Sequence, residues 1–271
     1  MTRSLPPAQF LRPRSVFISD VHLGFRGCRA EALCDFLRAV QPEFLFLVGD
    51  IIDLWSLKKS FYWPTAHANA LRAVLCKARE GTRVIFIPGN HDELFRTLDG
   101  SVFGDLEVHR EFLHTTADGR RLLILHGDEF DSVVKCHPAL VRLGTGLYDF
   151  LLWVNPWVNR VRSWFGFGHF SLATALKSAT QRAVQYIANF EEAAAQAARR
   201  HGADGVVCGH IHHASVRDID GITYCNDGDW VEHCSAILED SDGSLSLLHW
   251  PEQPSMSSWA PAATASRARA A

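Results

Sequence analysis

The sequence SVFISDVH, residues 15–22, ends an apolar run with an aspartate and a histidine two positions apart. Similar apolar runs precede the polar blocks at residues 49–50 and 89–92, and helical patterns lie between them at residues 30–40 and 65–79. This alternation predicts a βαβαβ unit with a parallel sheet. The carboxyl ends of such strands line one crevice, so we expect the three polar blocks to converge there.

Two further polar blocks follow apolar runs later in the chain. Residues 126–128 follow the run 122–125, and residues 209–212 follow the run 205–208. Together the five blocks offer carboxylate, amide and imidazole groups, which suit Mn²⁺, Fe or Zn²⁺ better than Ca²⁺. There are too many such groups for one tetrahedral ion, so we expect two divalent metal ions, with Mn²⁺ first and Fe or Zn²⁺ as alternatives. The candidate ligands are Asp20, His22, Asp50, Asn90, His126, His210 and His212.

Composition narrows the class of protein. A chain of 271 residues that is 47% hydrophobic can bury one large α/β core, alone or with an insertion. The net charge of −3 disfavours a nucleic-acid partner bound through bulk charge. Seven cysteines without a CxxC pair fit a reducing cytoplasm, and no apolar run has the length of a membrane span. We expect a flexible N-terminus at residues 1–14, one domain at residues 15–250 and a disordered tail at residues 251–271.

The region after residue 128 departs from the alternating pattern. Residues 133–178 read as helical and aromatic, residues 183–200 as a long helix, and the chain then returns to short β runs separated by Asp-Gly turns. Within residues 133–182 there are six basic residues and one acid. Tryptophans at helical spacing beside basic residues suit a lipid headgroup boundary, although such a stripe can equally pack onto the body of the domain. The candidate substrate-binding residues are Trp153, Trp157, Arg160, Arg162 and Trp164.

The combined order Asp-x-His, Gly-Asp-x-x-Asp, Gly-Asn-His-Asp, His and Gly-His-x-His resembles the calcineurin-like metallophosphoesterase family over roughly residues 15–250. The resemblance implies a four-layer α-β-β-α sandwich with a helical lid insertion at residues 133–182, and a dinuclear site. His91 would protonate the leaving oxygen or stabilise the transition state, and Asp92 would orient its imidazole. Asp53 reads equally as a helix-start residue or as a partner of the site. The resemblance assigns Asp20, His22, Asp50 and His212 to one metal, and Asp50, Asn90, His126 and His210 to the other.

Within this family the chain looks most like the branch that hydrolyses UDP-2,3-diacylglucosamine in lipid A biosynthesis. The segment GDIIDLW at residues 49–55, the insertion, and the segment DGDW at residues 227–230 carry this likeness. His91 departs from it, because the best-studied form of that enzyme has Arg at this position. It implies a nucleotide-glycolipid substrate, a cytoplasmic location in a bacterium and weak contact with the inner-membrane surface. A soluble phosphodiesterase or phosphatase is the alternative within enzymes, a nuclease is disfavoured, and a non-catalytic scaffold is a further alternative. The sequence leaves the oligomeric state open.

Overall fold

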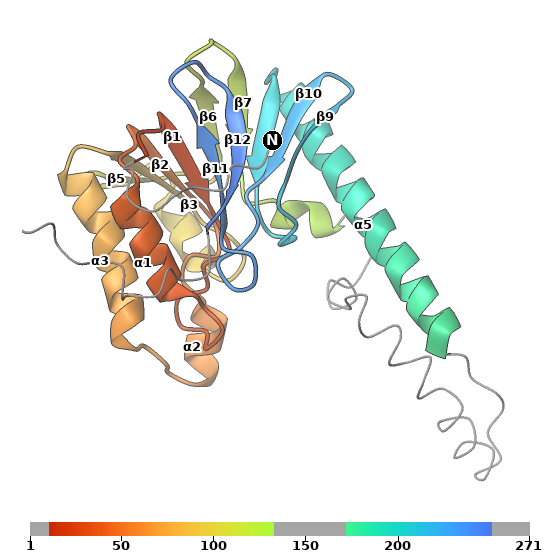
Figure 1. The fold of residues 1–271 in the computed structure, drawn as a ribbon, viewed down its shortest axis with the longest axis horizontal. Coiled ribbons are helices and arrows are strands. Elements are labelled where there is room, and N and C mark those ends of the chain that lie inside the picture. The colour runs from red at the N-terminus through yellow and green to blue at the C-terminus, as the bar shows by residue number, and fades with distance from the viewer. Residues whose placement is uncertain (1–10, 133–171, 251–271) are drawn as a thin grey trace, which may run out of the picture.

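A computed structural model describes residues 11–132 and 172–250 of the chain (Figure 1). Residues 11–14, expected to belong to a flexible N-terminus, contact the body of the domain. The Leu11 N–H donates to the Ala39 carbonyl at 2.9 Å, and the Arg14 guanidinium lies 2.6 Å from a carboxylate oxygen of Glu239. None of the helices within these two ranges is both long enough and apolar enough to cross a bilayer.

The first sheet has seven strands in the order β12-β11-β1-β2-β3-β5-β4. Its centre is parallel, from β1 to β2, β3 and β5, and antiparallel strands complete both edges. The bounds are β1 Ser15–Ile18, β2 Phe44–Val48, β3 Arg83–Ile87, β4 Val102–Phe103, β5 Leu106–Val108, β11 Ser235–Glu239 and β12 Leu245–His249.

The second sheet has five strands in the order β6-β7-β8-β10-β9, with β7, β8 and β10 parallel. Asp220 and Gly221 join β9 to β10, and their φ values of 50° and 82° are those of the type I′ turn that a two-residue hairpin favours. The bounds are β6 Phe112–Thr115, β7 Arg121–Ile124, β8 Gly205–Cys208, β9 Ser215–Ile219 and β10 Ile222–Asn226.

Helices cover the outer faces of both sheets, which gives four layers (Figure 1). Helices α1 and α3 lie against the first sheet, and α5 lies against the second. Short helices follow three of the strands that lead to the polar blocks: α2 after β2, the 3-10 helix η1 after β3, and the 3-10 helix η2 after β7. The bounds are α1 Ala30–Ala39, α2 Leu54–Lys59, α3 Thr65–Arg79, η1 Glu93–Leu98, η2 Asp128–Ser132 and α5 Leu172–Arg200.

Three apolar clusters fill the spaces between these layers. On β1, Val16 and Ile18 point to the cluster under α1 and α3, while Phe17 points to the cluster between the two sheets and stacks on Phe46 at 4.7 Å. Phe190 of α5 packs in the third cluster, against the outer face of the second sheet. Each central strand is therefore buried on both faces, as the continuous apolar runs predict. The four-layer architecture expected from the sequence is confirmed, and the expected lid insertion lies mostly outside the described residues.

Candidate metal centre

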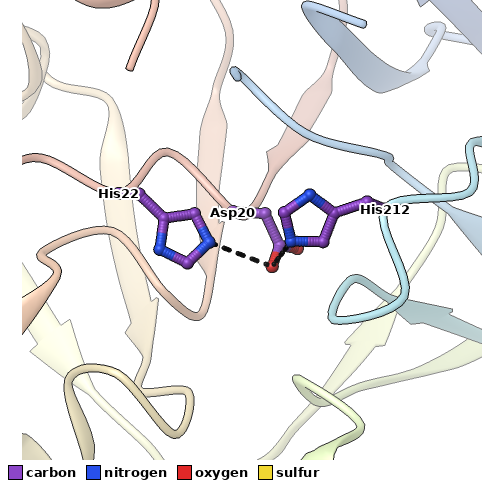
Figure 2. Close-up of side chains that lie close together, drawn as sticks. All are labelled: Asp20, His22 and His212. Carbon is purple, nitrogen blue, oxygen red and sulfur yellow. Dashed lines mark ion pairs between the residues drawn. The ribbon is translucent and has the colours of Figure 1, made fainter. Parts of the chain in front are cut away.

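The polar blocks converge at the carboxyl ends of the parallel strands of both sheets. Asp20 and His22 follow β1, and His212 follows β8 in the other sheet. Figure 2 shows these three side chains facing one another: the Asp20 Oδ1 atom lies 3.2 Å from His212 Nε2 and 3.8 Å from His22 Nε2. A carboxylate and two imidazoles at this spacing can hold a cation, because each contributes one donor atom to a shared point.

Asp50, directly after β2, lies at the centre of a second group of donors. Its Oδ2 atom is 3.5 Å from His126 Nε2 and 3.9 Å from both His22 Nε2 and His91 Nε2. Its Oδ1 atom accepts the His91 backbone N–H at 2.8 Å, which fixes the plane of the carboxylate. Asp50 belongs to two of the three donor groups, one with His22 and His91 and one with Asp20 and His126. This position is what a carboxylate shared by two cations requires.

Buried acceptor atoms without partners test whether these residues fit a metal. Asp20 Oδ1, Asn90 Oδ1 and His126 Nε2 are all buried, and apart from the carboxylate–imidazole contacts given above none has a hydrogen-bond partner within the described part of the chain. The other ring nitrogen of His126, Nδ1, lies 2.9 Å from the Val48 carbonyl oxygen. Donation from Nδ1–H leaves the lone pair of Nε2 directed at Asp50. Three orphaned lone pairs in one buried place are costly without a cation, so the residues present fit a divalent metal centre.

The backbone at this centre is unusual. Asp20, His22, Asp50, His210 and His212 all have positive φ values between 50° and 70°. Left-handed backbone is uncommon for residues other than glycine, costs of order 1 kcal/mol or more per residue, and clusters at functional sites. These residues lie on the loops that follow β1, β2 and β8, and the positive φ turns the backbone sharply at each of them. Sequence reasoning did not foresee this conformation, although Asp and His tolerate it better than most residues.

Two glycines beside the ligands permit the close packing of the centre. A Cβ atom on Gly49 would lie 2.2 Å from His126 Nδ1, and Gly49 itself has a φ of 85°. A Cβ atom on Gly209 would lie 2.2 Å from Ser19 Oγ and 2.5 Å from Asp20 Oδ2. Any side chain at either position would displace a candidate ligand, which explains why glycine precedes the ligand in these blocks.

His210 lies beside His126, with 5.2 Å between ring centroids, and its orientation depends on a residue that sequence reasoning missed. Its Nε2 atom lies 3.0 Å from Asp131 Oδ2, and the hydroxyl of Tyr186 donates to Asp131 Oδ1 at 2.8 Å. Donation from Nε2–H leaves Nδ1 as the ring nitrogen of His210 with a lone pair for a metal. Asp131 belongs to η2 and Tyr186 to α5, so the two residues are far apart in sequence and no local sequence motif predicts their contact.

His91 is oriented by Asp53. The Nδ1 atom of His91 lies 3.0 Å from Asp53 Oδ1, and the indole of Trp55 packs on its ring at 4.2 Å between centroids. The same carboxylate lies 3.6 Å from His22 Nδ1 and accepts the Ser56 backbone N–H at 2.7 Å as the N-cap of α2. Asp53 is therefore both a helix-start residue and a partner of the site.

The ionisation of His91 reflects these neighbours. Burial lowers its pKa, but the hydrogen bond with Asp53 and the charges of Asp50, Asp53 and Asp20 outweigh burial, so the pKa of His91 is raised above its ordinary value. The protonated imidazole is thereby favoured. His91 is half-buried beside Asp50 and can present a proton at Nε2 to a group bound there.

Asp92 does not orient the His91 ring, contrary to the prediction. Its two carboxylate oxygens accept backbone N–H groups from Gly89, Asp50, Ile51 and Ile52 at 2.6 to 3.3 Å. No hydrogen bond or ion pair joins it to the His91 ring in the described residues. The prediction that Asp92 orients His91 is therefore wrong: Asp92 instead fixes the loop after β2 against the loop after β3. Burial, followed by the charge of Asp50, raises the pKa of Asp92 to about 6.

The predicted substrate residues Trp153, Trp157, Arg160, Arg162 and Trp164 lie outside the described residues.

The structure places all seven candidate metal ligands on the loops that follow strands β1, β2, β3, β7 and β8. The six cysteines within the described residues are all free.

Comparison with known proteins identifies the class of this site. Residues 13–214 match the calcineurin-like phosphoesterase family model, and the chain belongs to this family. It is 28% identical over 250 residues to a UDP-2,3-diacylglucosamine hydrolase of Xanthomonas campestris pv. campestris, covering 84% of this chain and 96% of that protein. Proteins of the same name from Pseudomonas paraeruginosa and Neisseria meningitidis serogroup B are 29% and 26% identical, each over 84% of this chain and 95% of their own length. The chain is thus a hydrolase of phosphoester or pyrophosphate bonds with a divalent metal centre.

Proposed function

We propose that the chain hydrolyses the diphosphate of a nucleotide-linked glycolipid of the UDP-2,3-diacylglucosamine type, releasing UMP and a lipid monophosphate. The observation that carries the proposal is the name shared by the three relatives, each of which aligns over 84% of this chain. The donor groups around Asp20 and Asp50 supply the chemistry that such a reaction needs. A nucleotide-linked lipid, bound from the bacterial inner-membrane surface, is the partner that the proposal implies.

The proposed ligands divide between two divalent ions, with Mn²⁺ first and Fe or Zn²⁺ as alternatives. When bound, such a pair stabilises negative charge on phosphoryl oxygens and lowers the pKa of a water molecule. Asp50 would be shared between the ions. Asp20, His22 and His212 would complete one set of ligands, and Asn90, His126 and His210 the other.

His91 is the proposed general acid. Water attacks one phosphorus of the diphosphate, the bond from that phosphorus to the bridging oxygen breaks, and the bridging oxygen leaves on the second phosphate. His91, whose Nε2 lies 3.9 Å from Asp50 Oδ2, would donate a proton from Nε2 to that leaving oxygen. Asp53 would keep the ring in place through Nδ1, so that the proton at Nε2 remains directed at the Asp50 side of the site.

The insertion at residues 133–182 is the proposed binding site for the lipid part of the substrate. Trp153, Trp157 and Trp164, with Arg160 and Arg162, would bind acyl chains and an anionic headgroup. Charge reversal of both arginines should leave hydrolysis of a small chromogenic diester unchanged and abolish turnover of the glycolipid. Equal loss of both activities would show that the insertion supports the fold rather than the substrate.

The first experiment is Mn²⁺-supplemented hydrolysis of UDP-2,3-diacylglucosamine in detergent micelles beside bis(4-nitrophenyl) phosphate. Release of UMP and lipid monophosphate from the first substrate is the expected result. Turnover of the diester alone would refute the glycolipid and favour the alternative, a soluble phosphodiesterase or phosphatase. No turnover of either substrate with Mn²⁺, Fe or Zn²⁺ would favour a non-catalytic scaffold of the same fold.

A further inference from the structure

Two segments beside the metal centre carry exposed aromatic side chains among positive charges. The loop after β1 exposes Phe25, α2 exposes Trp55, and the segment after α2 exposes Phe61, with 41%, 49% and 81% of their surface accessible. Residues 24–29 and 54–64 contain two arginines and two lysines and no acidic residue, although the chain as a whole carries a net charge of −3. This local composition differs in sign from the rest of the molecule.

The two segments form one packed unit. A Cβ atom on Gly24 would lie only 2.6 Å from Leu57 Cγ, so the loop after β1 sits directly on α2. The guanidinium of Arg26 lies 4.4 Å from the ring centroid of Tyr62, which joins the same loop to the segment after α2. His67 of α3 accepts the Gly24 N–H at 2.9 Å, and the rings of Tyr62 and Trp63 meet its edge. The exposed aromatic residues therefore stand on a fixed support rather than on a free loop.

Phe61 is the clearest sign of an external partner. Its neighbours Tyr62 and Trp63 turn inward to His67, whereas Phe61 remains 81% exposed at the end of the run Lys58-Lys59-Ser60. No ion pair joins Lys58 or Lys59 to another side chain in the described ranges. Exposed apolar groups beside clustered cations are typical of protein surfaces that bind phospholipid headgroups, with aromatic rings at the acyl boundary.

We propose that Phe25, Arg26, Trp55, Lys58, Lys59 and Phe61 form a docking face for an anionic lipid bilayer. Charge complementarity selects this occupant, because the two segments that form the face carry four cations and no acidic residue, and the cytoplasmic leaflet is anionic. Trp55 also contacts His91, so the face adjoins the metal centre and would hold it at the membrane surface. This inference extends the proposed function, since a lipid-linked substrate is taken from that surface.

Co-sedimentation of the full chain with vesicles tests the face. Vesicles of phosphatidylethanolamine with 30% phosphatidylglycerol should bind the protein in a salt-sensitive manner, and phosphatidylcholine vesicles should not. Each cation near an anionic surface contributes about fivefold to binding, so K58E/K59E should weaken it by at least about 25-fold. Phe61→Ser should weaken it about tenfold through loss of apolar burial. Hydrolysis of the small chromogenic diester should stay unchanged in both variants.

The matched control is R38E/R79E, which makes the same change of charge in the last turns of α1 and α3. This control should bind vesicles as the unmodified protein does. Equal binding by K58E/K59E and the control would overturn the docking face. Binding of single-stranded polyuridylate in preference to anionic vesicles, lost in K58E/K59E, would also overturn it. Micellar hydrolysis of the glycolipid reports the proposed function separately, because it needs no bilayer.

Discussion

Replacement of Asp53 by asparagine separates the two tasks of this residue. In the protein, Asp53 Oδ1 accepts the Ser56 N–H at 2.7 Å and meets His91 Nδ1 at 3.0 Å, while Oδ2 meets Ser56 Oγ at 2.7 Å and His22 Nδ1 at 3.6 Å. Asparagine caps helices as well as aspartate does, so D53N should keep α2 and change the free energy of unfolding by only a few tenths of a kcal/mol. Asp53→Ala should cost about 1 kcal/mol more, because the cap is lost.

The expected loss of activity follows from the contact with His91. A positioned general acid increases the reaction rate about 10²–10⁴-fold. The asparagine amide carries no negative charge, so it would hold and orient the His91 ring less well than the Asp53 carboxylate does. We expect kcat for bis(4-nitrophenyl) phosphate to fall at least about 10²-fold in D53N, which corresponds to about 2.7 kcal/mol of transition-state stabilisation. Metal content, measured by mass spectrometry after dialysis, should remain near that of the unmodified protein, because Asp53 is not a proposed ligand.

Two further variants make this prediction refutable. Ser56→Ala removes the hydroxyl contact to Asp53 Oδ2 without touching either histidine, and its kcat should stay within a few-fold of normal. If Asp53 acts through His91, then D53N should have almost no additional effect in a His91→Ala background. Additive losses in the double variant would refute the role of Asp53 as the positioning residue of His91.

Three other predictions concern the metal centre and the fold. Asp50→Ala should lose both metal ions, because the Asp50 carboxylate faces three imidazoles. The control Asp35→Ala changes an exposed carboxylate and should retain both ions in the same metal analysis. An Asp50→Ala protein that still binds both ions would exclude the role of Asp50 as a shared ligand. Gly209→Ala should weaken metal binding about 10–100-fold in a calorimetric titration, since the new Cβ would displace Asp20, and unchanged affinity would count against that packing. Burial raises the pKa of Glu239, but hydrogen bonds from His114, Ser15, Ala117 and Arg14 lower it to about 2. Because this folded-state pKa lies below the unfolded value, Glu239 stabilises the fold above about pH 4.5 and loses up to about 3 kcal/mol of that stabilisation as the pH falls toward 2. Urea unfolding of Glu239→Gln should lack this acid-dependent loss, and parallel pH curves for the two proteins would contradict it.

The architecture could be predicted because its determinants are local in sequence. The buried runs at residues 44–48 and 205–208 match β2 and β8 residue for residue, and the Asp-Gly pair at residues 220–221 forms the predicted hairpin turn. Helix α2 was missed because six residues without a buried member carry no amphipathic pattern. The short strands β4, β5 and β6 were missed for a similar reason, since few of their side chains are buried.

The identity of the ligands could also be predicted, but the residues that orient them could not. A ligand block shows itself through residue types at the end of a strand, whereas Asp131 and Tyr186 meet only because η2 and α5 pack together. The prediction that Asp92 orients His91 was wrong because it assumed that residues adjacent in sequence have side chains in contact. On an extended or turning chain, neighbouring side chains diverge, and the carboxylate three residues beyond Asp50 was the one within reach.

The left-handed residues explain how the centre keeps its shape. Such conformations persist only where surrounding contacts over-determine them. Here the loop after β1 donates its Asp20 and His22 N–H groups to the carbonyls of Gly49 and Asp50, and the His210 N–H donates to Asp20 Oδ2 at 2.8 Å. The loops that carry the ligands are thus hydrogen-bonded to one another as well as to their own strands. Because these bonds use backbone groups and the second oxygen of Asp20, they leave Oδ1 of Asp20 and Nε2 of His126 without a hydrogen-bond partner within the described residues. The hydrogen bonds of the polypeptide therefore hold the donors of this centre in place.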